Sequence, residues 1–158
     1  TLAIRNPDRA QYFINNQLER IKNEDRRRRF EFIAPALSGS ELIRDEFFYS
    51  LMDEENRQTE SWVLAGLRAL HHPSRRSESE KYILPSLILL EEIQQTGDIF
   101  FPKRWLDATL GNYNSASAVK TVDKFLAERP DYNAQLRMKI LQSADQMKRA
   151  HKILSKTN

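Results

Sequence analysis

Apolar residues recur every three or four positions along most of the chain, a spacing that places them on one face of an α-helix. The pattern predicts about eight helical segments. They begin near Pro7, Asp25, Ser40, Arg57, Lys81, Pro102, Ser115 and Asn133. Lengths of roughly 10 to 20 residues with short joints favour antiparallel helix hairpins. We therefore expect an all-α fold in which the hairpins stack into a curved array similar to armadillo or HEAT repeats.

Polar caps and helix-breaking residues set the predicted boundaries. The expected N-caps are Asn6, Ser40, Ser115 and Asn133, and Ser77 with Glu80 has the spacing of a capping box. Gly97 suits the left-handed position after a helix, Pro102 suits a first turn, and Gly111 can end that helix. Pro35 is expected to bend or end the second segment. The segment from Tyr82 to Ile93 is apolar on nearly every side, which predicts central burial.

The composition limits the classes of protein to which this chain can belong. The 158 residues are 40% hydrophobic and 30% charged, enough for one packed domain spanning 1–158. The 25 basic and 22 acidic side chains leave a net charge of +3, so long-range attraction for polyanions should be weak. With no cysteine, disulfides and Cys-based metal sites are excluded. No apolar run is long enough for a membrane span, so we expect a soluble chain, cytoplasmic or periplasmic.

Catalytic signatures are missing from this sequence. A zinc peptidase needs two histidines one helical turn apart with a glutamate beside the first. The histidines are His71, His72 and His151, and neighbouring helical residues point about 100° apart. We interpret His71 and His72 as a structural helix end. There is no glycine-flanked nucleophile and no phosphate-binding loop, so this chain alone predicts no catalytic residues, metal ligands or cofactor.

Two groups of basic residues are candidates for binding. Arg26 to Arg29 spread around a helix axis and are flanked by acidic residues, which favours a solvated face over a nucleic-acid site. Lys103 and Arg104 follow Phe100 at a helix entrance. The simplest interpretation is core aromatics with cations at the rim. The functional interpretation is a basic wall that receives a peptide carboxylate, since a guanidinium suits that group.

Several segments carry a family resemblance. They are Arg5-Asn6-Pro7-Asp8-Arg9, Arg29-Phe30-Glu31-Phe32-Ile33, Asn56-Arg57-Gln58-Thr59-Glu60-Ser61-Trp62-Val63, Phe100-Phe101-Pro102-Lys103-Arg104-Trp105-Leu106 and the closing helix. With these segments the chain resembles the C-terminal helical domain of the zinc aminopeptidases related to aminopeptidase N, in particular the bacterial members. None of the segments is a catalytic signature.

The resemblance implies a non-catalytic domain that covers the active-site chamber and helps bind or restrict peptide substrates. Zinc and the Gly-Ala-Met-Glu-Asn motif would lie in a preceding catalytic domain of the same polypeptide, the partner of this one. The chain starts at Thr1, and we expect it to be the C-terminal fragment of that longer peptidase. By analogy Arg57, Lys103 and Arg104 are the candidate chamber-facing, substrate-binding cations.

Two other classes compete with this interpretation. A free-standing helical-repeat scaffold that binds a protein partner in its groove has the same composition. A basic-helix nucleic-acid binder is the weaker alternative and predicts binding that depends steeply on salt.

Overall fold

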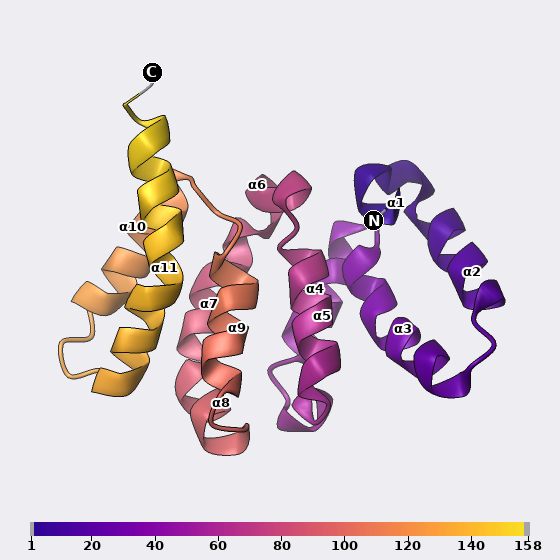
Figure 1. The fold of residues 1–158 in the computed structure, drawn as a ribbon, viewed down its shortest axis with the longest axis horizontal. Helices are drawn as coiled ribbons and strands as arrows, with labels where there is room; N and C mark the ends of the chain where they lie inside the picture. Colours follow the sequence, from indigo (N-terminus) through magenta and orange to yellow (C-terminus); the bar gives the residue numbers. More distant parts are fainter. Residues whose placement is uncertain (1, 157–158) are drawn as a thin grey trace. The chain divides into compact units, whose positions relative to one another are not determined.

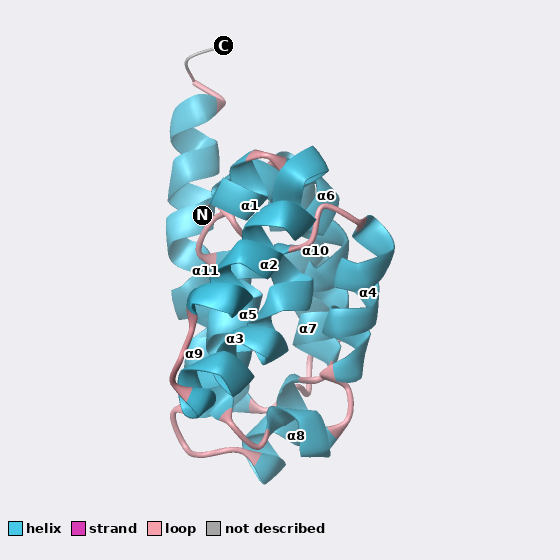
Figure 2. Ribbon diagram, turned by 90° about the vertical axis from the view of Figure 1, so that its right-hand side faces the viewer, coloured by secondary structure: helices cyan, strands magenta, loops and turns pink. Residues whose placement is uncertain are grey.

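The computed structural model describes residues 2–156, and these are helices joined by loops (Figures 1 and 2). No strand occurs within this range, so the all-α prediction is confirmed. The chain divides after Arg75 into two compact units, which are described separately. Whether they act as one domain, and whether the hairpins form a curved repeat array, stays a prediction.

The first unit consists of five α-helices and three short 3-10 turns. In chain order they are α1 (Leu2–Arg5), a turn at Pro7–Arg9, α2 (Ala10–Arg20), α3 (Glu24–Leu37), α4 (Glu41–Ser50), a turn at Glu54–Arg57, α5 (Glu60–Leu70) and a turn at Pro73–Arg75. Helices α2 and α3 run antiparallel as a hairpin (Figure 1), and α3 also packs against α4 and α5.

The second unit contains the remaining helices. They are α6 (Arg76–Ser79), a 3-10 turn at Glu80–Tyr82, α7 (Ile83–Ile88), α8 (Leu90–Thr96), α9 (Phe101–Leu110), α10 (Ala116–Ala127) and α11 (Ala134–Leu154). Helix α9 packs against α7, α8 and α11, and α10 packs against α7 and α11. Helix α9 is therefore the element that most of this unit surrounds.

All the predicted helices occur, and one of them is divided into two. They correspond to α2, α3, α4, α5, α7 with α8, α9, α10 and α11. The fifth segment breaks between Ile88 and Leu90, and two of its apolar residues, Leu84 and Ile88, are exposed although we expected burial all round. The one-turn helices α1 and α6 were not predicted because four residues are too short to show a helical period. Pro35 lies inside α3, two residues before its end.

All four predicted N-caps lie at N-cap positions, and two of them form side-chain cap bonds. The Ser115 hydroxyl accepts from the amide of Ala118, and Asn133 Oδ1 accepts from the amides of Gln135 and Leu136. Asn6 and Ser40 precede their helices without a side-chain cap bond. The Asn6 amide group instead donates to the carbonyl of Leu2, the first residue of α1. The sequence did not predict α1, so this use of Asn6 was not expected.

The other boundary predictions near glycine and serine need correction. Gly97 follows α8 with φ −99° and ψ 177°, which is extended and not left-handed. Gly111 caps α9 in the right-handed helical region, so it does end that helix. Ser77 lies inside α6 and starts no helix, and the carboxylate of Glu80 accepts from Ser115 Oγ at 2.7 Å. Tertiary contacts have replaced the local capping box.

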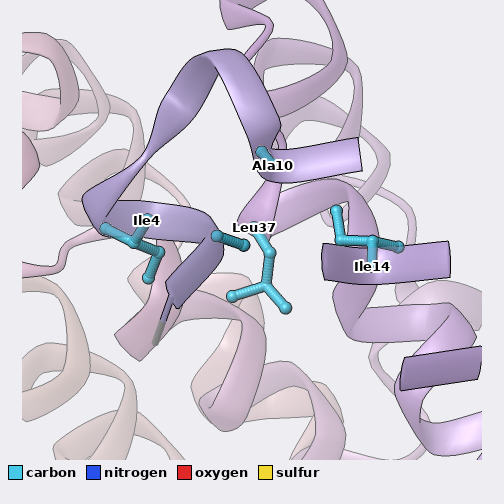
Figure 3. Packing of buried hydrophobic residues seen from close by; sticks show 5 residues of the cluster. Ile4, Ala10, Ile14 and Leu37 are labelled. Carbon is cyan, nitrogen blue, oxygen red and sulfur yellow. The ribbon is translucent and has the colours of Figure 1, made fainter. Parts of the chain in front are cut away.

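Packing of the first unit centres on small and branched apolar side chains. Ala3 and Ile4 from α1, Ala10 and Ile14 from α2 and Leu37 from α3 form one buried cluster (Figure 3). Phe13 and Phe30 are partly buried against this cluster. Full burial of a large apolar side chain contributes about 1.5–3 kcal/mol, so the cluster holds the α2–α3 hairpin on α1.

Buried arginines complete the first unit. The Arg44 guanidinium donates to the carbonyls of Ser38 and Gly39 at 3.0 and 2.8 Å. The Arg75 guanidinium donates to those of Ala36, Leu37 and Ser38 at 3.0, 3.1 and 2.8 Å. A helix leaves its last carbonyls without intrahelical donors. Two cations therefore satisfy the end of α3, where the helix dipole also favours positive charge.

Two aromatic side chains of α9 lie in the core of the second unit. Phe101 and Trp105 on α9 are buried with ring centroids 6.0 Å apart in an edge-to-face arrangement. The indole Nε1 of Trp105 donates to the carbonyl of Ser86 at 3.3 Å, which ties α9 to α7. On α11, Leu136, Ile140, Ala144 and Met147 are buried along one face. Leu154, near the end of this helix, is 49% exposed.

Close approach of the backbone to Gly39 generates the first prediction. A Cβ atom there would lie 2.1 Å from the carbonyl oxygen of Pro7, so Gly39→Ala must push the Pro7–Arg9 turn away. We expect a loss of about 2 kcal/mol in the free energy of unfolding, measured by urea denaturation. Ser40→Ala, next to it and exposed without a cap bond, is the control and should change stability by under about 0.5 kcal/mol. Equal effects of the two variants would contradict the close approach at Gly39.

Candidate functional site

The start of α9 presents the candidate site predicted from the sequence. A carboxylate oxygen of Asp98 accepts from the backbone amides of Phe100 and Phe101 at 2.6 and 3.1 Å. Pro102 lies in the first turn, as predicted. The amides that a helix start would offer to a ligand are thus partly used by Asp98. Ligand binding here depends on side chains.

Phe100 and Arg104 form the exposed part of this site. Phe100 is 61% exposed, and the Cζ atom of Arg104, itself an exposed residue, lies 5.7 Å from its ring centroid. This distance is within the range of a cation–π contact. The expectation that the aromatics of this segment are core is confirmed for Phe101 and Trp105 and wrong for Phe100. The spacing in the sequence could have predicted this contact. Residues four apart lie on the same face of a helix, which places Phe100 beside Arg104.

Lys103 is engaged within the second unit. Its Nζ lies 2.5 and 2.7 Å from the two carboxylate oxygens of Asp107, one turn further along α9. The hydroxyl of Ser143 on α11 donates to the same carboxylate at 2.8 Å. Asp107 therefore links Lys103 to the packing of α9 on α11. A ligand carboxylate would have to compete with Asp107 for this ammonium group.

Arg57 belongs to the first unit and is only 4% exposed. Its Nη1 donates to the carbonyls of Leu51 and Met52 at 2.7 and 2.8 Å, just after the end of α4. This is the same use of a guanidinium as at the end of α3. The observed role of Arg57 is to hold the α4–α5 connection.

Of the three predicted cations, Arg104 best fits the binding role. Lys103 is its neighbour on α9 and has an intramolecular carboxylate partner, whereas Arg57 lies in the other unit and faces backbone carbonyls. An exposed guanidinium beside an exposed ring offers a carboxylate two parallel hydrogen bonds and offers an apolar side chain a contact surface. The arrangement suits a peptide end more than a small inorganic ion.

The histidines take no part in this site. His71 caps the end of α5, where its backbone amide donates to the carbonyl of Leu67, and its side chain is fully buried. Burial lowers the pKa of His71 from 6.5 to about 3, so the imidazole is neutral at pH 7. These observations support the interpretation of His71 as a structural residue at a helix end. The ring there is neutral and not a cation. Within residues 2–156, no group of three or more metal-ligating side chains converges.

None of the helices described has the length and hydropathy that crossing a membrane requires.

Comparison with known proteins gives no assignment: no family model, no curated protein and no solved structure matches the chain.

The burial of the His71 imidazole leads to the second prediction. The unfolded chain protonates His71 near pH 6.5 and the folded chain only near pH 3, so the free energy of unfolding falls as the pH drops between these values. From pH 7 to pH 5 the loss from this residue is up to about 2 kcal/mol. His71→Gln should reduce this acid sensitivity in urea denaturation at the two pH values. The half-buried His151→Gln control should retain it, and an unchanged pH slope in His71→Gln would refute the assignment.

Proposed function

We propose that this chain is the non-catalytic C-terminal helical domain of a zinc aminopeptidase and that it helps bind or restrict peptide substrates. The chemistry would belong to a catalytic domain earlier in the same polypeptide. The contribution of this domain would be to contact the distal part of a peptide whose amino end lies at the zinc. Binding energy from the distal part can be used to orient the reacting end.

The observation that carries the proposal is the exposed pair of Phe100 and Arg104. It lies in the segment that is most distinctive in the resemblance, and the next residues, Phe101 and Trp105, anchor it rigidly in the core. A peptide carboxylate that pairs with Arg104 would place its last side chain against the ring of Phe100. Peptides would gain this contact, whereas a single amino-acid amide is too short to reach it.

Exposed apolar side chains in the second unit give additional support. Leu84 and Ile88 are one turn apart on α7, and Met138 and Leu141 are three residues apart on α11. Such spacing places each pair on one helix face. Pairs of this kind fit a face that a preceding catalytic domain would cover, as the proposal requires.

The parent enzyme is tested at the level of its gene. The coding sequence upstream of Thr1 should contain, in frame and within a few hundred codons, a His-Glu-x-x-His motif. A start codon directly before Thr1 would refute the proposal and would leave the scaffold interpretation in first place.

The role of Arg104 is tested in the full-length enzyme. Arg104→Ala should reduce kcat/KM for peptides of several residues by about tenfold, which is the value of one exposed charge-assisted contact, about 1.4 kcal/mol. Turnover of a single-residue amide should be unchanged. Lys120→Ala, which removes another exposed cation of the same unit on α10, is the matched control. Equal losses for peptide and amide, or the same loss in the control, would contradict the assignment.

A further inference from the structure

A basic groove lies at the turn of the α2–α3 hairpin, in the first unit and separate from the α9 site. Its volume is about 830 Å³. Arg20 and Lys22 line it from the end of α2 and the connecting loop, and Arg26 and Arg29 line it from α3. Ile21, Phe30 and Ile33 form its apolar part. Among the described residues, no acidic side chain lines this groove.

The structure divides the arginine run into two pairs with different surroundings. Arg27 Nε lies 3.0 Å from a carboxylate oxygen of Glu31, and Arg28 Nε lies 3.5 Å from one of Glu24. Arg26 and Arg29 have no ion-pair partner within residues 2–156, and both are exposed. All four arginines are exposed, as expected of a solvated face, and Arg26 and Arg29 also border the groove.

The remaining cations of the groove are also available to a ligand. Arg20 is exposed and has no side-chain hydrogen bond or ion pair with the described residues. Lys22 Nζ has one long contact, 3.4 Å to the carbonyl of Glu19. Four positive side chains thus surround one concavity. No carboxylate from the described residues lines it. These four charges exceed the net charge of +3 that the whole chain carries.

An apolar surface continues from the basic groove. A second concavity of about 500 Å³ shares Gln17, Arg20 and Phe30 with it and is also lined by Leu2 and Tyr12, which are 62% and 54% exposed. A ligand that spans the two would need negative charge at one end and an apolar side chain at the other.

We propose that this composite groove binds an acidic peptide segment that carries one or two large apolar side chains. The carboxylates would pair with Arg20, Arg26 and Arg29, and the apolar side chains would rest on Phe30 and the adjoining surface. Single-stranded nucleic acid fits less well, because it stacks its bases on exposed rings. Phe30, the one aromatic residue among the described residues that line the basic groove, is half-buried against the core. The exposed ring of Tyr12 in the adjoining concavity already has a cation–π partner, because Arg9 Cζ lies 5.0 Å from its centroid. The inference does not depend on the proposed function, which rests on the second unit.

The test measures binding of a defined peptide to the whole chain. The probe is fluorescein-labelled Gly-Glu-Glu-Leu-Phe-Glu-Glu-Gly with a C-terminal amide, followed by fluorescence anisotropy at low salt. Two further peptides carry Gln in place of every Glu, or Ser in place of Leu and Phe. Binding should be saturable and should weaken at least fivefold with either change. Equal binding of the serine peptide would overturn the proposal, since the apolar surface would then contribute nothing.

A matched pair of variants locates the site. Arg26→Gln with Arg29→Gln should weaken binding about tenfold, because two exposed charge pairs with the peptide are lost. Arg27→Gln with Arg28→Gln makes the same charge change in the same helix turn and should alter affinity less than twofold. Similar losses in both variants would show a general electrostatic effect and overturn the proposal.

Two more measurements map the bound peptide and compare it with nucleic acid. A photo-reactive group at the peptide's Phe position should crosslink to the protein within residues 12–33. Crosslinks confined to other segments would contradict the site. This experiment uses the unmodified chain, so it does not depend on whether the variants fold. A labelled oligothymidylate of equal charge should bind more weakly than the peptide. Tighter binding of the oligonucleotide, with the same dependence on Arg26 and Arg29, would replace the peptide with nucleic acid.

Discussion

The first unit depends on the hydrogen bonds that Arg44 and Arg75 donate to the carboxyl end of α3. Both residues are 3% exposed, and their guanidinium groups meet at the carbonyl of Ser38, which accepts from both. Helix α3 packs on α2, α4 and α5, so a disturbance of α3 reaches all three of these helices. The buried carbonyls would otherwise lack donors, and a buried cation without partners is also unfavourable. Each group makes burial of the other possible.

Arginine serves three different purposes in this chain, and the surroundings of each residue decide which. Arg44, Arg57 and Arg75 are buried and donate to backbone carbonyls at helix ends. Arg27 and Arg28 pair with glutamates one turn away and add little stability, since such pairs are exposed. Arg26, Arg29 and Arg104 are exposed at concave or aromatic surfaces. The two binding proposals rest on this last group, which lacks a carboxylate partner among the described residues.

Local signals predicted the fold class and the main helices, whereas long-range contacts could not be predicted. The caps at Ser115 and Asn133 were predictable because donor and acceptor lie within three residues. The role of Arg75 was not, because its acceptors lie 37 to 39 residues away in the chain. In the α9 segment the sequence showed the aromatic and basic residues side by side but assigned Phe100 to the core. Only the packing of Phe101 and Trp105 determines which aromatic face is left exposed.

The dependence of the first unit on its buried arginines is tested best by the stability of Arg75→Met in urea denaturation of the whole chain. Methionine keeps much of the apolar stem but removes the arginine donors to the buried carbonyls of Ala36 and Leu37, while that of Ser38 keeps Arg44. We predict a loss of at least about 2 kcal/mol, because each unsatisfied buried acceptor costs roughly 1–3 kcal/mol. Arg68→Met on the exposed side of α5 should change stability by less than about 0.5 kcal/mol. A similar small change in both variants would show that arginine at the end of α3 does not hold the first unit together.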